Sequence, residues 1–117
     1  TLSLHDALPI YEGMFHENAV AQELVSNGHK LFFYTSYNRE KHRNDIEIDF
    51  IISNKSKTNF RIYPIEVKSS RSYSIRSMER FLDKFNDRTD RAYVIHTKNF
   101  KTEGNIVYIP SYMTMCL

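Results

Sequence analysis

The chain has 117 residues, enough for one small domain, and 41% of them are hydrophobic, which can supply a core and excludes a disordered tail. No apolar run approaches the length of a membrane-spanning helix. A single cysteine, Cys116, excludes an internal disulfide and is compatible with a reducing compartment, so we expect a cytoplasmic protein. A net charge of +2 is too small to identify a nucleic-acid-binding protein by itself.

Residues 1–10 do not fit the pattern of the rest of the chain. They lack the basic start, the long apolar stretch and the cleavage site of a signal peptide. The string resembles the translated read-through of a sequencing adapter, which implies that the natural protein begins upstream and that this chain is its C-terminal fragment. The alternative is an ordinary N-terminal coil that ends at Pro9. We set this segment aside and assign one domain to residues 11–117.

Hydrophobic periodicity predicts two helices and five strands. Apolar residues recur at helical spacing from Met14 to Val25, and Gly28 is a typical residue just past a helix end. A second amphipathic helix is predicted from the spacing of Ile75, Met78, Phe81, Leu82 and Phe85. In chain order, we expect a helix at 14–27, strands at 30–37, 45–53 and 60–68, a helix at 75–86, and strands at 91–97 and 106–109.

This order of elements predicts an α/β fold. A helix between two strands usually forms a right-handed crossover that joins parallel strands, whereas short turns join antiparallel ones. We therefore expect a mixed sheet with helices on both faces. Pro64 lies inside the third predicted strand and has no amide hydrogen. It should sit on an edge, at a bulge or where strand pairing lapses, which argues against an uninterrupted central strand.

Four residues form the candidate site: Glu17, Asp49, Glu66 and Lys68. Side chains alternate along a strand, so Glu66 and Lys68 share one face, and Asp49 can lie beside Glu66 if the two strands pair as a hairpin. Glu17 falls inside the apolar stripe of the first helix, where a carboxylate is costly unless it is paired or bound. Glu23 falls on the opposite face and is expected in solvent.

Two neighbouring carboxylates repel unless a proton, a cation or a lysine offsets them, so the pKa of Asp49 or Glu66 should be raised without metal. Mg²⁺ or Mn²⁺ would offset the charge, with Asp49 and Glu66 as ligands and Glu17 binding through water or at a second ion. Lys68 would hold a phosphate or an attacking water. The plainer alternative is a solvent-facing strand surface, since Glu-x-Lys and Glu-x-Asp are common there.

These residues resemble the site of the PD-(D/E)XK nuclease superfamily. Glu17 on a helix, Asp49 on the second strand and Glu66-Val67-Lys68 on the third match its pattern, except that Ile48 stands where the proline of the name would be. The resemblance implies an αβββαβ restriction-endonuclease-like core. It also implies a metal-dependent nuclease with Asp49, Glu66 and Lys68 as catalytic residues.

A closer resemblance covers most of residues 13–117. It is to a domain of unknown function at the C-terminus of bacterial and archaeal AAA-type ATP-binding proteins. That resemblance implies an upstream ATPase domain, although the chain has no G-x-x-x-x-G-K-[ST] motif of its own. The motifs that carry it are Gly13-Met14-Phe15-His16-Glu17-Asn18, Ala21-x-Glu23-Leu24, Glu47-Ile48-Asp49-Phe50, Ile65-Glu66-Val67-Lys68-Ser69 and Gly104-Asn105-Ile106-Val107-Tyr108-Ile109-Pro110-x-Tyr112-Met113.

Two functional hypotheses follow. The first is a metal-dependent DNA endonuclease module served by an ATPase. The second is a non-catalytic module that keeps the nuclease fold to bind DNA or to mediate ATPase assembly. A basic cluster of Lys68, Arg71 and Arg76 is compatible with DNA in either case, although a solvated loop explains it equally well. Tyr73 beside this cluster would stack on a base or, more commonly, pack in the protein.

Overall fold

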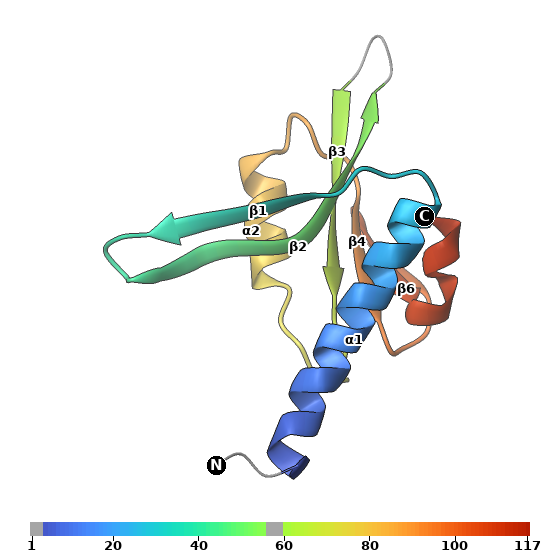
Figure 1. The fold of residues 1–117 in the computed structure, drawn as a ribbon. Coiled ribbons are helices and arrows are strands. Elements are labelled where there is room, and N and C mark those ends of the chain that lie inside the picture. Colours follow the sequence, from blue (N-terminus) through green and yellow to red (C-terminus); the bar gives the residue numbers. More distant parts are fainter. Residues whose placement is uncertain (1–3, 56–59) are drawn as a thin grey trace.

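The structure, a computed structural model, describes the backbone of residues 4–55 and 60–117 and the side chains of residues 13–54 and 60–117. Figure 1 shows the arrangement of its helices and strands. The elements are α1 (Leu4–Ser26), β1 (Phe32–Asn38), β2 (Arg43–Lys55), β3 (Phe60–Val67), α2 (Arg76–Lys84), β4 (Ala92–His96), β5 (Lys101–Glu103), β6 (Ile106–Pro110) and the 3₁₀ helix η1 (Ser111–Cys116).

The strands form one mixed sheet in the order β1-β2-β3-β4-β6-β5. β1, β2 and β3 pair antiparallel, whereas β3 with β4 and β4 with β6 pair parallel. Helix α2 is the crossover between β3 and β4, as the element order predicted. The expected α/β fold with a mixed sheet is confirmed at this level. The short edge strand β5, which pairs antiparallel with β6, and the helix η1 were not predicted.

The two helices cover opposite faces of the sheet, and each face has its own core (Figure 1). On the α1 face, Val20 and Leu24 of the helix pack with buried residues of β2, β3 and β4. On the α2 face, Met78 and Phe81 pack with buried residues of β2, β4 and β6. Because side chains alternate between the two faces of the sheet, one strand can contribute residues to both cores.

Helix α1 begins at Leu4, well before the predicted start near Met14. The alternative of a coil that ends at Pro9 is therefore wrong, because the helix continues through that residue. Gly13 lies close to the loop that follows β3: a Cβ atom there would be 3.6 Å from Ser69 Oγ. This close approach brings the turn of α1 that precedes Glu17 next to the end of β3. Within residues 4–55 and 60–117, no helix is long and apolar enough to cross a membrane.

Pro64 lies in β3, which is a central strand, so the edge, one of the three places expected for it, is excluded. It pairs with Ile51 of β2, but the parallel pairing with β4 begins only at Ile65. Along β3, Ile62 and Lys68 donate their amide hydrogens toward the β4 side, so the missing amide of Pro64 falls on that side as well. The proline therefore occupies a place where pairing lapses, which was one of the alternatives left open.

Candidate functional site

The site lies where β2 and β3 separate. Their antiparallel register ends at Phe50 opposite Ile65, and one further step brings Asp49 opposite Glu66. The amide of Val67 donates to Asp49 Oδ2 at 2.8 Å. The aspartate therefore satisfies a backbone donor at the point where the strand pairing has ended.

An extra residue in β2 accompanies this separation. Between Phe32 opposite Ile51 and Tyr34 opposite Ile48, β2 advances one residue more than β1. The side-chain alternation slips at the same place, because Ile48 packs in the α2-side core and Phe50 in the α1-side core. Asp49 lies within this bulge. Bulges bend a strand and redirect a side chain, and they are common next to active sites.

Glu66 is the most unusual polar residue of the site. Its side chain is only 4% exposed, and its Oε2 has no hydrogen-bond partner among the described residues. The nearest cation is the Lys68 ammonium, 3.7 Å from that oxygen. Burial raises the pKa of the Glu66 carboxyl to about 7; the charge of Lys68 opposes this and that of Asp49 adds to it. Glu66 is thus a buried carboxyl that could lose its proton near neutral pH if a cation were bound beside it.

The pKa of Asp49 is also shifted. Burial raises the pKa of its carboxyl, the amide of Val67 and the charge of Lys68 oppose the rise, and the charge of Glu47 adds to it. The pKa values of both carboxyls therefore move in the direction expected from the sequence, with burial as the larger cause. Asp49, Glu66 and Lys68 act electrostatically on one another, so the structure brings these three residues together.

Glu17 and Glu23 depart from their predicted positions. Glu17 was expected on the inward face of α1, but its side chain is exposed. Partial burial, and then the charge of Asp49, raise the pKa of Glu17, which places it at the rim of the site. Glu23 was expected in solvent, but it is half-buried and lines a groove between α1 and η1. The reason is η1, which covers that side of α1 and left no recognisable pattern in the sequence.

The family model described as a domain of unknown function (DUF4143) matches residues 12–113. The chain belongs to this family. DUF4143 is known as a C-terminal domain of AAA-type ATPases. No curated protein and no solved structure matches the chain.

The donor set of this DUF4143 domain fits a divalent cation in one respect. Asp49 and Glu66 supply two neighbouring carboxylates, one with a buried oxygen that lacks a partner, and Mg²⁺ is commonly held by one or two carboxylates together with water and phosphate. Among the described residues, no group of three or more acidic, histidine or cysteine side chains is arranged to hold a metal. Asp49 and Glu66 could therefore hold a cation only together with water or phosphate.

Apart from Tyr73, the residues that lie beside this site were not identified from the sequence. His96 at the end of β4 is 1% exposed, and its Nδ1 lies 2.9 Å from the hydroxyl of Tyr73. Lys98, Lys101 and Tyr108 line a cavity with Tyr73. These residues come from three separate segments, and only the parallel pairing of β3, β4 and β6 brings them together. No spacing within a single segment could have indicated the cluster.

Proposed function

We propose that this domain is a metal-dependent DNA endonuclease module that hydrolyses phosphodiester bonds. The observation that carries the proposal is Glu66: a buried carboxyl whose Oε2 lacks a hydrogen-bond partner, next to Asp49 and 3.7 Å from the ammonium of Lys68. Burying such a group is costly unless it has a partner. A divalent cation that bridges Asp49 and Glu66 would supply that partner.

Each residue has a role in this proposal. Asp49 and Glu66 would hold Mg²⁺ or Mn²⁺, and Glu17 at the rim would help to hold the ion through water. When bound, the metal supplies charge that stabilises a phosphodiester during hydrolysis and lowers the pKa of a bound water. Lys68 holds the phosphate or the attacking water as a compact positive charge that stays next to the carboxylates.

The resemblance to PD-(D/E)XK nucleases and the family membership support the same proposal. In the superfamily pattern, an acid on the second strand and Glu-x-Lys on the third form the site, and Asp49, Glu66 and Lys68 occupy those positions. The fold of this chain has the corresponding order of a helix, three strands, a helix and a strand. We propose further that the domain is served by an AAA-type ATPase domain in the same protein, as in other members of its family.

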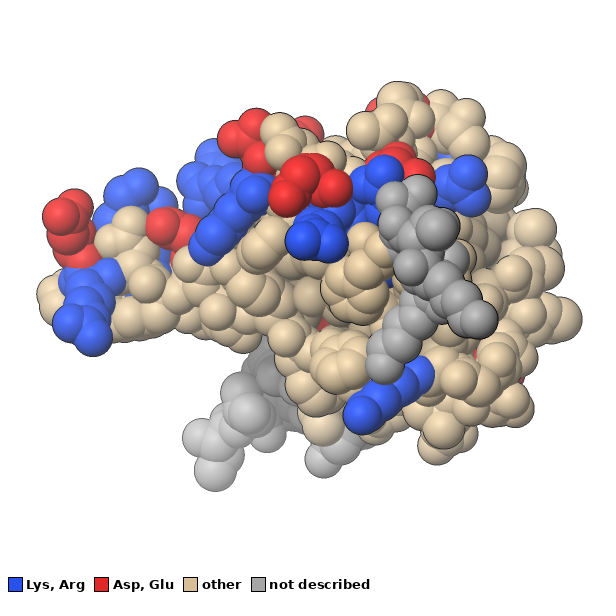
Figure 2. Space-filling model, turned by 90° about the horizontal axis from the view of Figure 1, so that it is seen from above, with Lys and Arg blue, Asp and Glu red and all other residues tan. Residues whose placement is uncertain are grey.

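DNA binding in this proposal depends on local groups of cations. Figure 2 shows one end of the molecule, where Lys and Arg side chains alternate with Asp and Glu, and the projecting arm formed by β1 and β2 carries both signs. On the described part of that face there is no broad field of one sign. In this proposal, contacts to phosphate come from small clusters of cations close to the site.

A second candidate is a non-catalytic module that keeps the fold to bind DNA or to mediate ATPase assembly. One observation favours it: the described residues supply two close carboxylates and no third metal-binding group beside them. In this case Glu66 would simply keep its proton at pH values below its pKa of about 7. The two candidates differ in whether the site holds a metal and whether DNA is cut.

A nicking assay separates the candidates. Purified chain is mixed with supercoiled plasmid, linear duplex or branched DNA in Mg²⁺ or Mn²⁺, with EDTA as the blank. We expect nicks that require metal and that disappear in Glu66→Gln, which keeps the shape of the side chain and removes its charge. Glu40→Gln, which makes the same change in the exposed turn between β1 and β2, is the matched control and should cut normally. Absence of cleavage of all three DNAs, with DNA binding intact, would favour the second candidate.

A further inference from the structure

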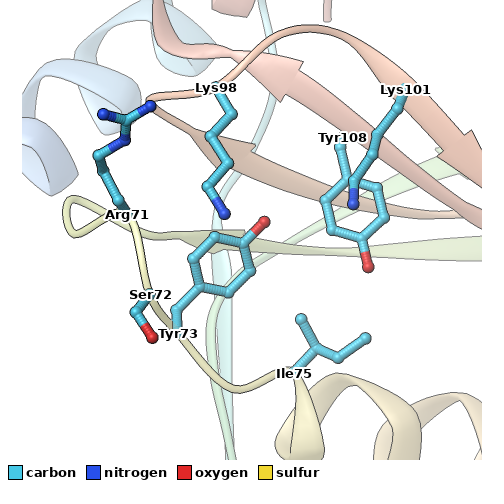
Figure 3. A pocket seen from close by; sticks show the side chains of 7 residues that line it. All are labelled: Arg71, Ser72, Tyr73, Ile75, Lys98, Lys101 and Tyr108. Atoms are coloured by element: carbon cyan, nitrogen blue, oxygen red, sulfur yellow. The ribbon is translucent and has the colours of Figure 1, made fainter.

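Next to the candidate site lies a basic cavity that the proposed reaction does not use. It has a volume of about 370 Å³, within the range of small-molecule sites. The cavity lies on the α2 face, beside the carboxyl ends of β3 and β4 (Figure 3). Its lining residues are Arg71, Ser72, Tyr73, Ile75, Lys98, Lys101 and Tyr108.

Two lysines lie over two tyrosine rings in this cavity, and Arg71 from a third segment also lines it. Lys98 lies over the ring of Tyr73, with its ammonium 5.4 Å from the ring centroid, and Lys101 lies over Tyr108 at 4.4 Å (Figure 3). Lys101 also pairs with Glu103 at 3.2 Å. Within the part of the chain that the structure describes, Arg71 and Lys98 have no ion-pair partner. The cavity thus keeps positive charge that its own protein does not neutralise.

A chain of hydrogen bonds fixes Tyr73 in the wall of the cavity. The carbonyl of Asn99 can only accept, so His96 Nε2 donates to it at 2.9 Å. In the neutral ring, Nδ1 then accepts from the hydroxyl of Tyr73 at 2.9 Å. The ring of Tyr73 is therefore held in place, with Lys98 on one side of it, as a rigid surface on which a flat group can stack.

Helix α2 adds to the positive potential. Ile75, its N-cap residue, lines the cavity and provides no side-chain cap for the first turn of the helix. The unpaired amide hydrogens of a helix N-terminus favour a negative group nearby. Glu79 and Glu103 lie near Tyr108, and Glu103 near Tyr73 as well, but Glu103 is paired with Lys101. Cations outnumber anions at the mouth of the cavity.

We infer that this cavity binds the phosphate of a nucleotide unit, with Arg71 and Lys98 on the phosphate and Tyr73 against the base. A guanidinium fork and an ammonium match the several oxygens of a phosphate, and an aromatic face accepts any base. A simple carboxylate ligand has fewer oxygens for Arg71 and Lys98 to contact, and it would not stack on Tyr73.

The cavity and the candidate site can serve one strand of DNA. Glu66 pairs with Val94, and His96, two residues further along β4, points to the same face as Val94. His96, which holds Tyr73, is thus about 6 to 7 Å along β4 from Val94, the neighbour of Glu66. The identification of the nucleotide as part of a cleaved strand rests on the proposed function, but phosphate binding itself does not.

The test measures binding without metal, so that cleavage plays no part. Fluorescence anisotropy with a labelled single-stranded DNA in EDTA is recorded over a series of salt concentrations. We expect Arg71→Ala and Lys98→Ala each to weaken binding about tenfold, because each removes a charged hydrogen bond to phosphate. Each should also reduce the slope of log affinity against log salt by about 1. Lys41→Ala, in the exposed turn between β1 and β2, removes the same charge elsewhere and should change neither value.

Competitors identify the group that is bound. Inorganic phosphate and a deoxynucleoside monophosphate should displace the DNA, whereas the nucleoside without phosphate should not. Equal loss of affinity in Lys41→Ala and Arg71→Ala, or equal competition by nucleoside and nucleotide, would overturn the inference. A protein that never cuts DNA but loses affinity in Arg71→Ala therefore refutes the proposed function and keeps this inference.

Discussion

Glu66 shows how burial and charge compete at a single residue. Its carboxyl is buried on the α2 face of β3, and the ammonium of Lys68 at 3.7 Å is too far to form a hydrogen bond. The attraction of Lys68 is therefore not enough to keep the carboxyl ionised below about pH 7, and burial prevails. A group with these properties either stays protonated or binds a cation, and both outcomes can be measured.

Glu66→Gln should change how stability depends on pH. The pKa of Glu66 is about 7 in the folded chain and 4.5 in the reference state, so the folded state binds more protons between these values. Stability contributed by this group is thus complete below the lower pKa and is lost as pH rises through about 7. In the absence of metal, the unmodified chain should lose up to about 3 kcal/mol more stability than Glu66→Gln as the pH rises through this range.

Urea unfolding at several pH values, in EDTA, measures this effect. The pKa of Asp49 is raised as well. The Glu66→Gln variant should therefore still lose some stability as the pH rises, but less than the unmodified chain. Glu40→Gln in the exposed turn should follow the unmodified chain at each pH. An identical slope of stability against pH in Glu66→Gln and the unmodified chain would show that Glu66 ionises normally.

Lys68→Ala and Asp49→Ala should separate metal binding from cleavage. Asp49 would be a direct ligand, so Asp49→Ala should lose both metal binding and cleavage, whereas Lys68→Ala should keep metal binding and lose cleavage. Calorimetric titration with Mn²⁺ and the nicking assay on the same preparations measure the two properties. Cleavage by Asp49→Ala at the unmodified rate would refute the metal-dependent mechanism.

At the scale of elements, periodicity was a good guide where a segment was long and two-sided. Both helices and five of the six strands were predicted near their observed positions. The edge strand β5 was missed because Lys101, Thr102 and Glu103 are all exposed polar residues, which leave no hydrophobic pattern. Helix η1 was missed for a related reason, since Thr114 is its only buried residue among those described.

The candidate site was predictable to the extent that it depends on the alternation of side chains along a strand. Glu66 and Lys68 share a face because they are two residues apart on one strand, and their ion pair follows from that. The bulge at Asp49 was not predictable, because it depends on how β1 and β2 pair. The exposure of Glu17 and the basic cavity also depend on contacts between distant segments, which no local pattern encodes.

The attachment of α2 to the sheet depends mainly on Phe81. Its side chain is fully buried, and its ring lies 5.4 Å from that of Tyr34 and 4.7 Å from that of Phe85. Phe81→Ala should cost about 3 to 5 kcal/mol, because it leaves a cavity between α2 and the sheet. Phe33→Ala removes the same ring from a position that is 74% exposed and should cost about 0.5 kcal/mol or less.

Urea unfolding of both variants measures these losses. The helix also positions Ile75 beside the basic cavity, so a small movement of α2 in Phe81→Ala should weaken DNA binding in EDTA as well. Equal destabilisation by the two alanine substitutions would contradict the assignment of Phe81 to the core that joins α2 to the sheet.

At the scale of the whole molecule, the proposed function would link folding to metal binding at the candidate site. The ladder of β2 and β3 opens at Asp49, and two carboxyls with raised pKa values face one another there. The folded chain without metal therefore contains a strained electrostatic arrangement that an ion would relieve. Because only the folded chain brings Asp49 and Glu66 together, a bound ion must stabilise folding.

Added Mn²⁺ should raise the unfolding temperature, and more so at higher pH. At a metal concentration about 100 times the dissociation constant, the expected stabilisation is about 2.7 kcal/mol. Below about pH 7, binding must first displace the proton of Glu66, so the apparent affinity should rise with pH and level off above that value. Thermal unfolding with and without Mn²⁺, about one pH unit to either side of the pKa, measures both effects. Glu66→Gln should lose this stabilisation and Glu40→Gln should keep it; the same gain at both pH values, or in Glu66→Gln, would place the ion elsewhere on the molecule.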